Sequence, residues 1–271
     1  MIPVHFPNVV YAELLKLYTR SAGLMTLAVS GLVGMVVAAV AAWLEYGIRT
    51  GMVQGPGVQG DTTQFSAILV GDWALYGRNF FVLPLMLLLV TATVVAGEYT
   101  DRTLREVAVR PLSRLSILLA KLLALLSLSA LSLFFTFGIA FGAGLAAFGL
   151  PASWELLPAL LAGYAASLLS DLAIICLGML ASMLMGGVGG VLISAAFLLG
   201  ADLALRGFLT ALNFFGVSGA SGLLPWTLGH ALDVWLGWKD GWEPQRFIVV
   251  VGVAIGAFSL AQLRFSRMDV P

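Results

Sequence analysis

The densest charge in this 271-residue chain lies between Glu98 and Lys121, in a stretch that also has a helical pattern of apolar residues. Carboxylate and guanidinium groups form strong charge-assisted hydrogen bonds, and apolar side chains between them can fill a cleft on another protein. This combination favours a protein–protein contact that transmits rigid-body motion. The residues expected to make it lie in the charged segment, residues 98–114: Glu98, Asp101, Arg102, Leu104, Arg105, Glu106, Val107 and Arg110.

A simpler interpretation is that these charges only fix the orientation of the chain in a membrane. The charged segment separates two apolar runs that are too long for the core of a soluble domain, and with Lys121 it contains five of the 14 Lys and Arg residues. Lys and Arg are enriched in cytoplasmic loops. Both interpretations place the charged segment in the cytoplasm.

Asp171 is a second candidate, because it lies near the middle of the apolar run from Leu156 to Met185. A charged side chain at the centre of a bilayer costs roughly 2.5 to 3.5 kcal/mol unless it is paired, protonated or in contact with water. We therefore expect Asp171 to face the protein interior. It either lies on a pathway for substrate or protons, or is a protonated acid bonded to Ser167, Ser170 or a neighbouring helix.

Other chemical motifs are weak. None of the three lysines follows a glycine, so the chain has no P-loop and ATP would have to be bound by another chain. Ser221, with His230 as base, resembles the nucleophile motif of rhomboid intramembrane proteases. Glu98 and Arg102 are similar to part of a glutamic protease motif. The surrounding sequence fits neither class, so an intramembrane protease and an ATP-independent transporter or scaffold stay as alternatives.

The composition, with 60% hydrophobic and 10% charged residues, excludes a soluble domain, because such domains carry about 25% charged residues. We expect no metal site, no cofactor in this chain and no nucleic-acid partner. The sequence predicts an all-α, polytopic membrane protein with one domain, residues 1–271. Its six expected transmembrane helices are Ala22–Tyr46, Phe80–Gly97, Leu115–Gly149, Leu156–Met185, Val188–Leu205 and Phe247–Leu263.

A cytoplasmic charged segment places both termini in the cytoplasm as well. Nine of the 14 basic residues are then inside, and all seven Trp lie near outer boundaries. Lys121 is expected at the inner interface, with its stem snorkelling towards water. The basic residues expected outside are Arg49, Arg78, Arg206, Lys239 and Arg246.

Three further features are expected from local patterns. Residues 8–20 predict an interfacial helix with Glu13 on its polar face, although a cytosolic extension of the first span fits nearly as well. Residues 207–244 predict an outer re-entrant segment, with a plain outer loop as the alternative. Asp202 and Arg206 have the spacing of an ion pair on one helix face. Three glycine pairs predict close packing within the chain: Gly138/Gly142, Gly186/Gly190 and Gly252/Gly256.

Several short motifs follow one another in fixed order over residues 83–121: Leu83-Pro84, Gly97-Glu98, Thr103-Leu104-Arg105, Arg110-Pro111-Leu112-Ser113-Arg114 and Ile117-Leu118-Leu119-Ala120-Lys121. This order closely resembles the hallmark of type-2 ABC exporter permeases. Glu13 in an N-terminal interfacial helix and the basic tail from Arg264 to Asp269 extend the resemblance to essentially the whole chain. Tyr99–Arg102 and Ala120 depart from the family pattern, which affects only details of the partner contact.

The resemblance implies a stand-alone permease subunit of an exporter in a prokaryotic inner membrane. Its partners would be two ATP-binding-cassette ATPase subunits, a second permease copy or paralogue, and membrane lipid. ATP and Mg²⁺ would bind in the ATPase subunits, so this chain would not itself be an enzyme. The charged segment would contain the coupling helix between helices 2 and 3. The substrate cannot be read from the sequence.

Overall fold

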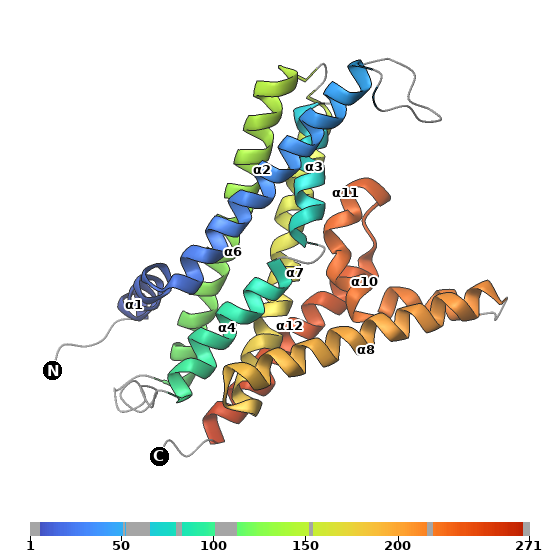
Figure 1. Cartoon of the computed structure of the whole chain (residues 1–271). Helices are drawn as coiled ribbons and strands as arrows, with labels where there is room; N and C mark the ends of the chain where they lie inside the picture. Colours follow the sequence, from blue (N-terminus) through green and yellow to red (C-terminus); the bar gives the residue numbers. More distant parts are fainter. Residues whose placement is uncertain are drawn as a thin grey trace.

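The structure is a computed structural model that describes residues 6–50, 52, 66–79, 83–100, 113–151, 154–215 and 219–267. Within these ranges all regular secondary structure is helical (Figure 1). The elements in chain order are α1 (Phe6–Thr19), α2 (Ser21–Arg49), α3 (Ala67–Gly77), α4 (Leu83–Thr100), α6 (Arg114–Phe148), α7 (Leu156–Met185), α8 (Val188–Phe214), α9 (Ala220–Leu223), η3 (Leu224–Trp226), α10 (Leu228–Leu232), η4 (Asp233–Leu236), α11 (Gly237–Asp240) and α12 (Pro244–Arg267).

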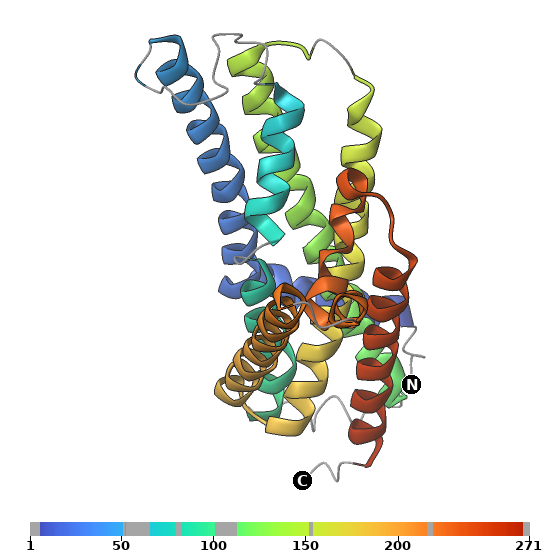
Figure 2. The same cartoon turned by 90° about the vertical axis from the view of Figure 1, so that its right-hand side faces the viewer.

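Five of these helices are long and apolar enough to cross a membrane, namely α2, α6, α7, α8 and α12. Helix α2 packs along α6, and α12 packs along α7, as Figures 1 and 2 show. The core lies where α4, α6 and α7 meet, and α1 and α12 close its lower end. Its fully buried side chains include Leu17, Leu87, Leu125, Ile175 and Phe265.

The second apolar stretch is divided into two short helices, α3 and α4. The sequence predicted α4 but missed α3, which begins where the Ser66 hydroxyl accepts a hydrogen bond of 3.3 Å from the Leu69 N–H. Such a cap satisfies one of the free N–H groups at a helix start. Arg78 and Asn79 follow the end of α3, so these polar residues lie between two helices rather than at an outer boundary.

A sharp turn separates α1 from α2, as expected for a distinct N-terminal helix. Arg20 has an extended backbone, with φ −80° and ψ 142°. A Cβ at Gly23 would lie 2.3 Å from the Leu17 carbonyl oxygen, so the turn requires glycine at that position. The expectation that Glu13 lies on the polar face is wrong, because its side chain is buried beside Val9 and Leu17.

Residues 207–244, the segment expected on the outer side, differ in part from the prediction. Residues 207–214 continue α8, and the short helices α9 to α11 occupy residues 220–240. Their contacts are with α7, α8 and α12, and Lys239 of α11 forms an ion pair with Asp72 of α3. Trp235 is buried and packs edge-to-face on Tyr76 at 4.8 Å, so it is not part of an interfacial Trp belt. Short helices packed on the bundle therefore occupy most of residues 220–240, and the outer, re-entrant position of the segment stays a prediction.

The glycine pairs do not pack as expected on α6 and α12. A Cβ on Gly138, or on any of Gly142, Gly252 and Gly256, would meet no atom within 4 Å. One of the close approaches is made instead by Gly34 of α2, where a Cβ would lie 2.9 Å from the Thr136 carbonyl oxygen of α6. Helix α2 therefore rests directly on the α6 backbone at this point.

We predict that Gly34→Leu lowers the melting temperature of the detergent-solubilised protein, because the new side chain pushes α2 away from α6. Overpacking of this kind costs about 2 kcal/mol, which corresponds to a decrease of roughly 4–8 °C. Gly138→Leu is the matched control, since its side chain enters open space on α6. Thermal unfolding followed by size-exclusion chromatography measures both. Equal melting temperatures for the two variants would contradict the packing described.

Candidate functional site

Two lysines and two glutamates form a closed group at the lower end of the bundle, which we call the Lys–Glu cluster (Glu13, Lys16, Glu98 and Lys121). The Lys121 Nζ lies 2.6 Å from Glu98 Oε2 and 2.9 Å from Glu13 Oε2. The Lys16 Nζ lies 3.1 Å from Glu13 Oε1 and 3.2 Å from Glu98 Oε1. Each carboxylate therefore bridges both ammonium groups, and the cluster joins α1, α4 and α6.

Burial differs sharply between the two lysines. The Lys121 side chain is 1% exposed and that of Lys16 is 42% exposed. The expectation that Lys121 snorkels to the interface is wrong, because α1 and α4 cover it and its charge is neutralised in place. Burial lowers the pKa of Lys16, but the carboxylates of Glu13 and Glu98 outweigh this effect and raise the pKa above its ordinary value. Lys16 is thus charged at neutral pH.

The two ends of the charged segment are both fixed to other helices. On its N-terminal side, Glu98 belongs to the Lys–Glu cluster. On its C-terminal side, the Arg114 guanidinium donates hydrogen bonds to the carbonyl oxygens of Phe265 and Ser266 in α12, at 2.7 and 2.8 Å. Ser113 caps α6 by accepting a hydrogen bond of 3.0 Å from the Ser116 N–H. A displacement of the charged segment must therefore act on α1, α6 and α12.

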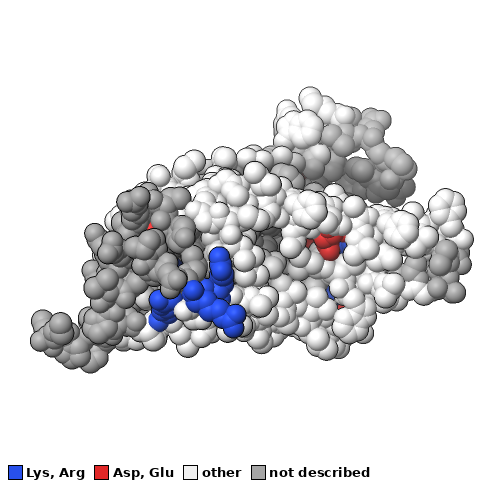
Figure 3. Space-filling view, turned by 90° about the horizontal axis from the view of Figure 1, so that it is seen from below, with Lys and Arg blue, Asp and Glu red and all other residues white. Residues whose placement is uncertain are grey.

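Basic side chains also gather on the lower face of the molecule (Figure 3). The last turn of α12 contributes Arg264 and Arg267, both exposed. Arg114 begins α6 beside that turn. The lower end of the bundle therefore presents positive charge next to the attachment points of the charged segment.

Most of the predicted contact residues lie outside the described ranges. Glu98 is the one that the structure describes, and its side chain points into the Lys–Glu cluster with 3% exposure. Its role within the chain is to fix the end of α4 to α1 and α6. The predicted residues outside the described ranges are Asp101, Arg102, Leu104, Arg105, Glu106, Val107 and Arg110.

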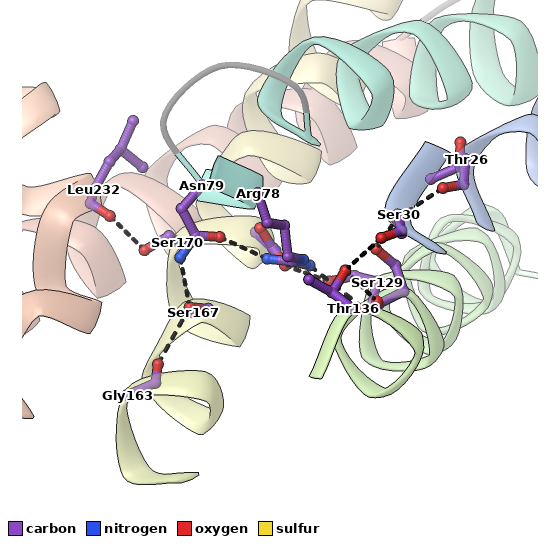
Figure 4. Close-up of polar contacts among 12 residues, drawn as sticks. Thr26, Ser30, Arg78, Asn79, Ser129, Thr136, Gly163, Ser167, Ser170 and Leu232 are labelled. Atoms are coloured by element: carbon purple, nitrogen blue, oxygen red, sulfur yellow. Dashed lines mark hydrogen bonds and ion pairs between the residues drawn. The ribbon is translucent and has the colours of Figure 1, made fainter. Parts of the chain in front are cut away.

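A second buried ion pair lies at the junction between α3 and α4 (Figure 4). The Arg78 guanidinium donates a hydrogen bond of 2.8 Å to the Asp171 carboxylate on α7, and the Ser129 hydroxyl of α6 donates to the same oxygen. Arg78 also donates to Asn79 at 2.7 Å, and Asn79 donates to Ser167 at 2.8 Å. The junction is thereby connected to α6 and α7.

Asp171 faces the interior, as predicted, and of the partners expected for it the neighbouring helices supply its contacts, through Arg78 and Ser129, whereas Ser167 and Ser170 do not. Ser167 donates to the Gly163 carbonyl and Ser170 donates to the Leu232 carbonyl, at 3.2 and 2.6 Å. The sequence did not identify Arg78 as the partner, because Arg78 was placed at the outer end of a span. The capped apolar run from Ser66 to Tyr76 was the available signal that a further helix precedes Arg78.

His230 belongs to a separate ionic contact. Its Nε2 lies 3.1 Å from the Glu243 carboxylate and 3.1 Å from Arg246 Nε. Hydrogen bonds from Arg246 and His230 lower the pKa of Glu243 below its ordinary value. The imidazole is thus engaged by an acid and a guanidinium, while the side chain of Ser221 lies outside the described residues. Within the described ranges, no group of three or more His, Cys, Asp and Glu residues could hold a metal ion.

We predict that Lys121→Met destabilises the protein by about 3 to 5 kcal/mol, because it leaves Glu13 and Glu98 as buried carboxylates with only the half-exposed Lys16. Lys16→Met should cost less than about 1 kcal/mol, since exposed ion pairs contribute little. Urea or thermal unfolding in detergent compares the two variants. Adding Glu13→Gln and Glu98→Gln to Lys121→Met should restore most of the stability. Equal losses for both lysines would contradict the account.

We further predict a strong energetic coupling between Arg78 and Asp171. Arg78→Met or Asp171→Asn alone should each cost about 3 to 5 kcal/mol, because each leaves one buried charge without a partner. The double variant should cost much less than the sum of the two. A double-mutant cycle on the free energy of unfolding measures this difference. Additive losses would show that the two side chains do not interact.

Comparison with known proteins agrees with this architecture. The family model described as ABC-2 family transporter protein matches residues 9–199, from α1 into α8. The matched range contains the Lys–Glu cluster, the charged segment and the Arg78–Asp171 pair. No curated protein matches the sequence. Because the match extends over more than half of a chain with five apolar helices of membrane-spanning length, the protein belongs to the ABC-2 family of transporter proteins, as a multi-pass membrane component.

Proposed function

We propose that the chain is the permease subunit of an ATP-binding-cassette exporter and moves its substrate with ATP hydrolysed by a separate nucleotide-binding subunit. Two such ATPase subunits and a second permease, either a copy or a paralogue, complete the transporter. The observation that carries this proposal is the attachment of the charged segment at both ends, through Glu98 and Arg114. A segment fixed in this way converts a push from a soluble partner into motion of the bundle.

The proposed topology has six crossings with both termini in the cytoplasm of an inner membrane. Helices α3 and α4 follow each other and together form the second crossing, because neither is as long as the other spans. Helix α1 lies in the membrane plane, with Glu13 and Leu17 turned towards the bundle and Tyr11 and Leu15 exposed. The charged segment then lies in the cytoplasm, where an ATPase subunit can reach it.

The second permease would pack against α8 and α2. Helix α8 is the least buried of the five long helices. Both helices expose rows of large apolar side chains, including Ile193, Phe197 and Leu203 on α8 and Leu32 and Met35 on α2. Lipid can cover such faces, and so can a second copy. The family resemblance favours the second copy, because permeases of this type meet mainly through their first and fifth helices.

In the proposed mechanism, closure of the two ATPase subunits around ATP pushes on Arg105, Arg110 and their neighbours. Glu98 passes this displacement to α1 and α6 through Lys121, and Arg114 passes it to α12. The contacts of Lys121 are short and buried and those of Arg114 are short, so the attached helices follow as rigid bodies. Their relative movement opens the path between the two permeases. In this mechanism the residues of this chain transmit movement, and the ATPase subunits hydrolyse ATP.

We predict that Arg105→Glu combined with Arg110→Glu abolishes co-purification of an ATPase subunit from native membranes and reduces ATPase activity in the eluate at least tenfold. Reversal of two charges at a contact turns attraction into repulsion. The matched control is Arg264→Glu with Arg267→Glu, which reverses the same number of charges on the exposed last turn of α12. The control should retain the ATPase. Failure of the intact chain to recover any ATPase would contradict the proposal.

A further inference from the structure

A cavity of about 490 Å³ lies between α4, α7, α8 and the short outer helices. Three carboxylates line it, those of Asp171, Asp202 and Asp233, together with the Arg206 guanidinium. Trp235 forms part of the wall. The family comparison assigns no role to this cavity, and the ionic contacts that fix the charged segment lie elsewhere in the chain.

Two of the three carboxylates are neutralised by partners within the chain. Arg78 contacts Asp171 at 2.8 Å, and Arg206 Nε lies 2.9 Å from Asp202. This i,i+4 pair on α8 is the one that the sequence predicted. Asp202 also accepts a hydrogen bond of 3.0 Å from the Gly229 N–H. Their charges therefore cancel before any ligand is present.

Asp233 is left as the excess acid. Its nearest described guanidinium is that of Arg206, 3.8 Å away and already paired with Asp202. Arg246 donates to the backbone carbonyl of Asp233 at 3.0 Å, and its own charge is balanced by Glu243 at 3.1 Å. Burial raises the pKa of the Asp233 carboxyl, although Arg206 and Arg246 act in the opposite direction. A cationic group in the cavity would supply a counter-charge that the described residues share between Asp202 and Asp233.

A second cavity, of about 170 Å³, continues from the first towards the turn between α7 and α8. The two cavities share Pro84, Ile174 and Leu232 as walls. The remaining wall of the smaller cavity is apolar apart from Ser194, and includes Leu177 and Leu198. An acidic cavity therefore adjoins an apolar one, and α4, α7 and α8 line both.

We propose that the two cavities together bind an amphipathic organic cation, with its charged group beside Asp233 and Trp235 and its apolar group against Leu177 and Leu198. Trp235 lines the same cavity as Asp233, so a cation bound there can also contact an aromatic side chain. A divalent metal ion fits less well, since the described residues contain no cluster of metal ligands. This assignment rests on the proposed function, because it names the substrate class of the exporter.

The test uses the full-length chain alone in lipid nanodiscs, with tetraphenylphosphonium as the probe and empty nanodiscs as the blank. We expect saturable binding of one probe per chain. Asp233→Asn should weaken binding about tenfold, which corresponds to about 1.4 kcal/mol. Asp240→Asn removes the same charge from an exposed position on α11 outside both cavities and should leave the affinity unchanged. Equilibrium dialysis gives the dissociation constants.

Two further comparisons keep the test decisive. Tetraphenylborate has the same shape and the opposite charge, and it should not compete for the site. Ser194→Phe fills the apolar cavity from α8 and should weaken binding of the phosphonium without touching a charge. Three results would overturn the proposal. They are equal losses of affinity in Asp233→Asn and Asp240→Asn, competition by tetraphenylborate, and binding no greater than that of empty nanodiscs. Binding without a co-purifying ATPase would instead reject the exporter function and retain the site.

Discussion

The burial of the Lys121 ammonium is the constraint on which the lower half of the structure depends. An ion held away from water requires partners that neutralise it and satisfy its hydrogen bonds. Lys121 obtains both from Glu13 of α1 and Glu98 of α4, and its third contact is the Val94 carbonyl oxygen at 3.4 Å. Because these partners come from separate helices, α1, α4 and α6 meet at one point.

The same requirement organises the centre of the bundle. Arg78 and Asn79 interrupt the apolar stretch before the charged segment, and polar side chains buried in a membrane protein require partners. Arg78 and Asn79 satisfy this requirement by contacting Asp171 and Ser167 on α7. The two ionic groups therefore lie at opposite ends of α4, which connects the cytoplasmic contact proposed for the charged segment to the cavity beside Asp171.

The sequence predicted those features that depend on residues close to one another along the chain. Helix periodicity and run length predicted the five long helices, and the four-residue spacing of Asp202 and Arg206 predicted their ion pair. Contacts between distant residues were not predictable in this way, because Arg78 and Asp171 are 93 residues apart and their meeting depends on the unexpected helix α3.

Glu13 illustrates the same limit on a smaller scale. As an acid beside Lys16 it fits the polar face of a surface helix, and only the position of Lys121 on α6 explains why it faces inward. Glu98 was singled out because of its place in a motif. The motif indicated that the residue is important, but not that its side chain points into the Lys–Glu cluster. The sequence shows which polar residues would be costly to bury. The packing of the helices determines which partner each of these residues contacts.

The most direct test of the central claim measures the position of α1 relative to α6. Spin labels are attached to cysteines introduced at Tyr11 and Leu123, which are both exposed, and pulsed electron paramagnetic resonance measures the distance between them. The single native cysteine, Cys176, is buried and so does not compete for the label. The account predicts one narrow distance distribution that stays narrow in Lys16→Met and broadens in Lys121→Met. An unchanged narrow distribution in Lys121→Met would show that the Lys–Glu cluster does not hold α1 in place, and would contradict the account.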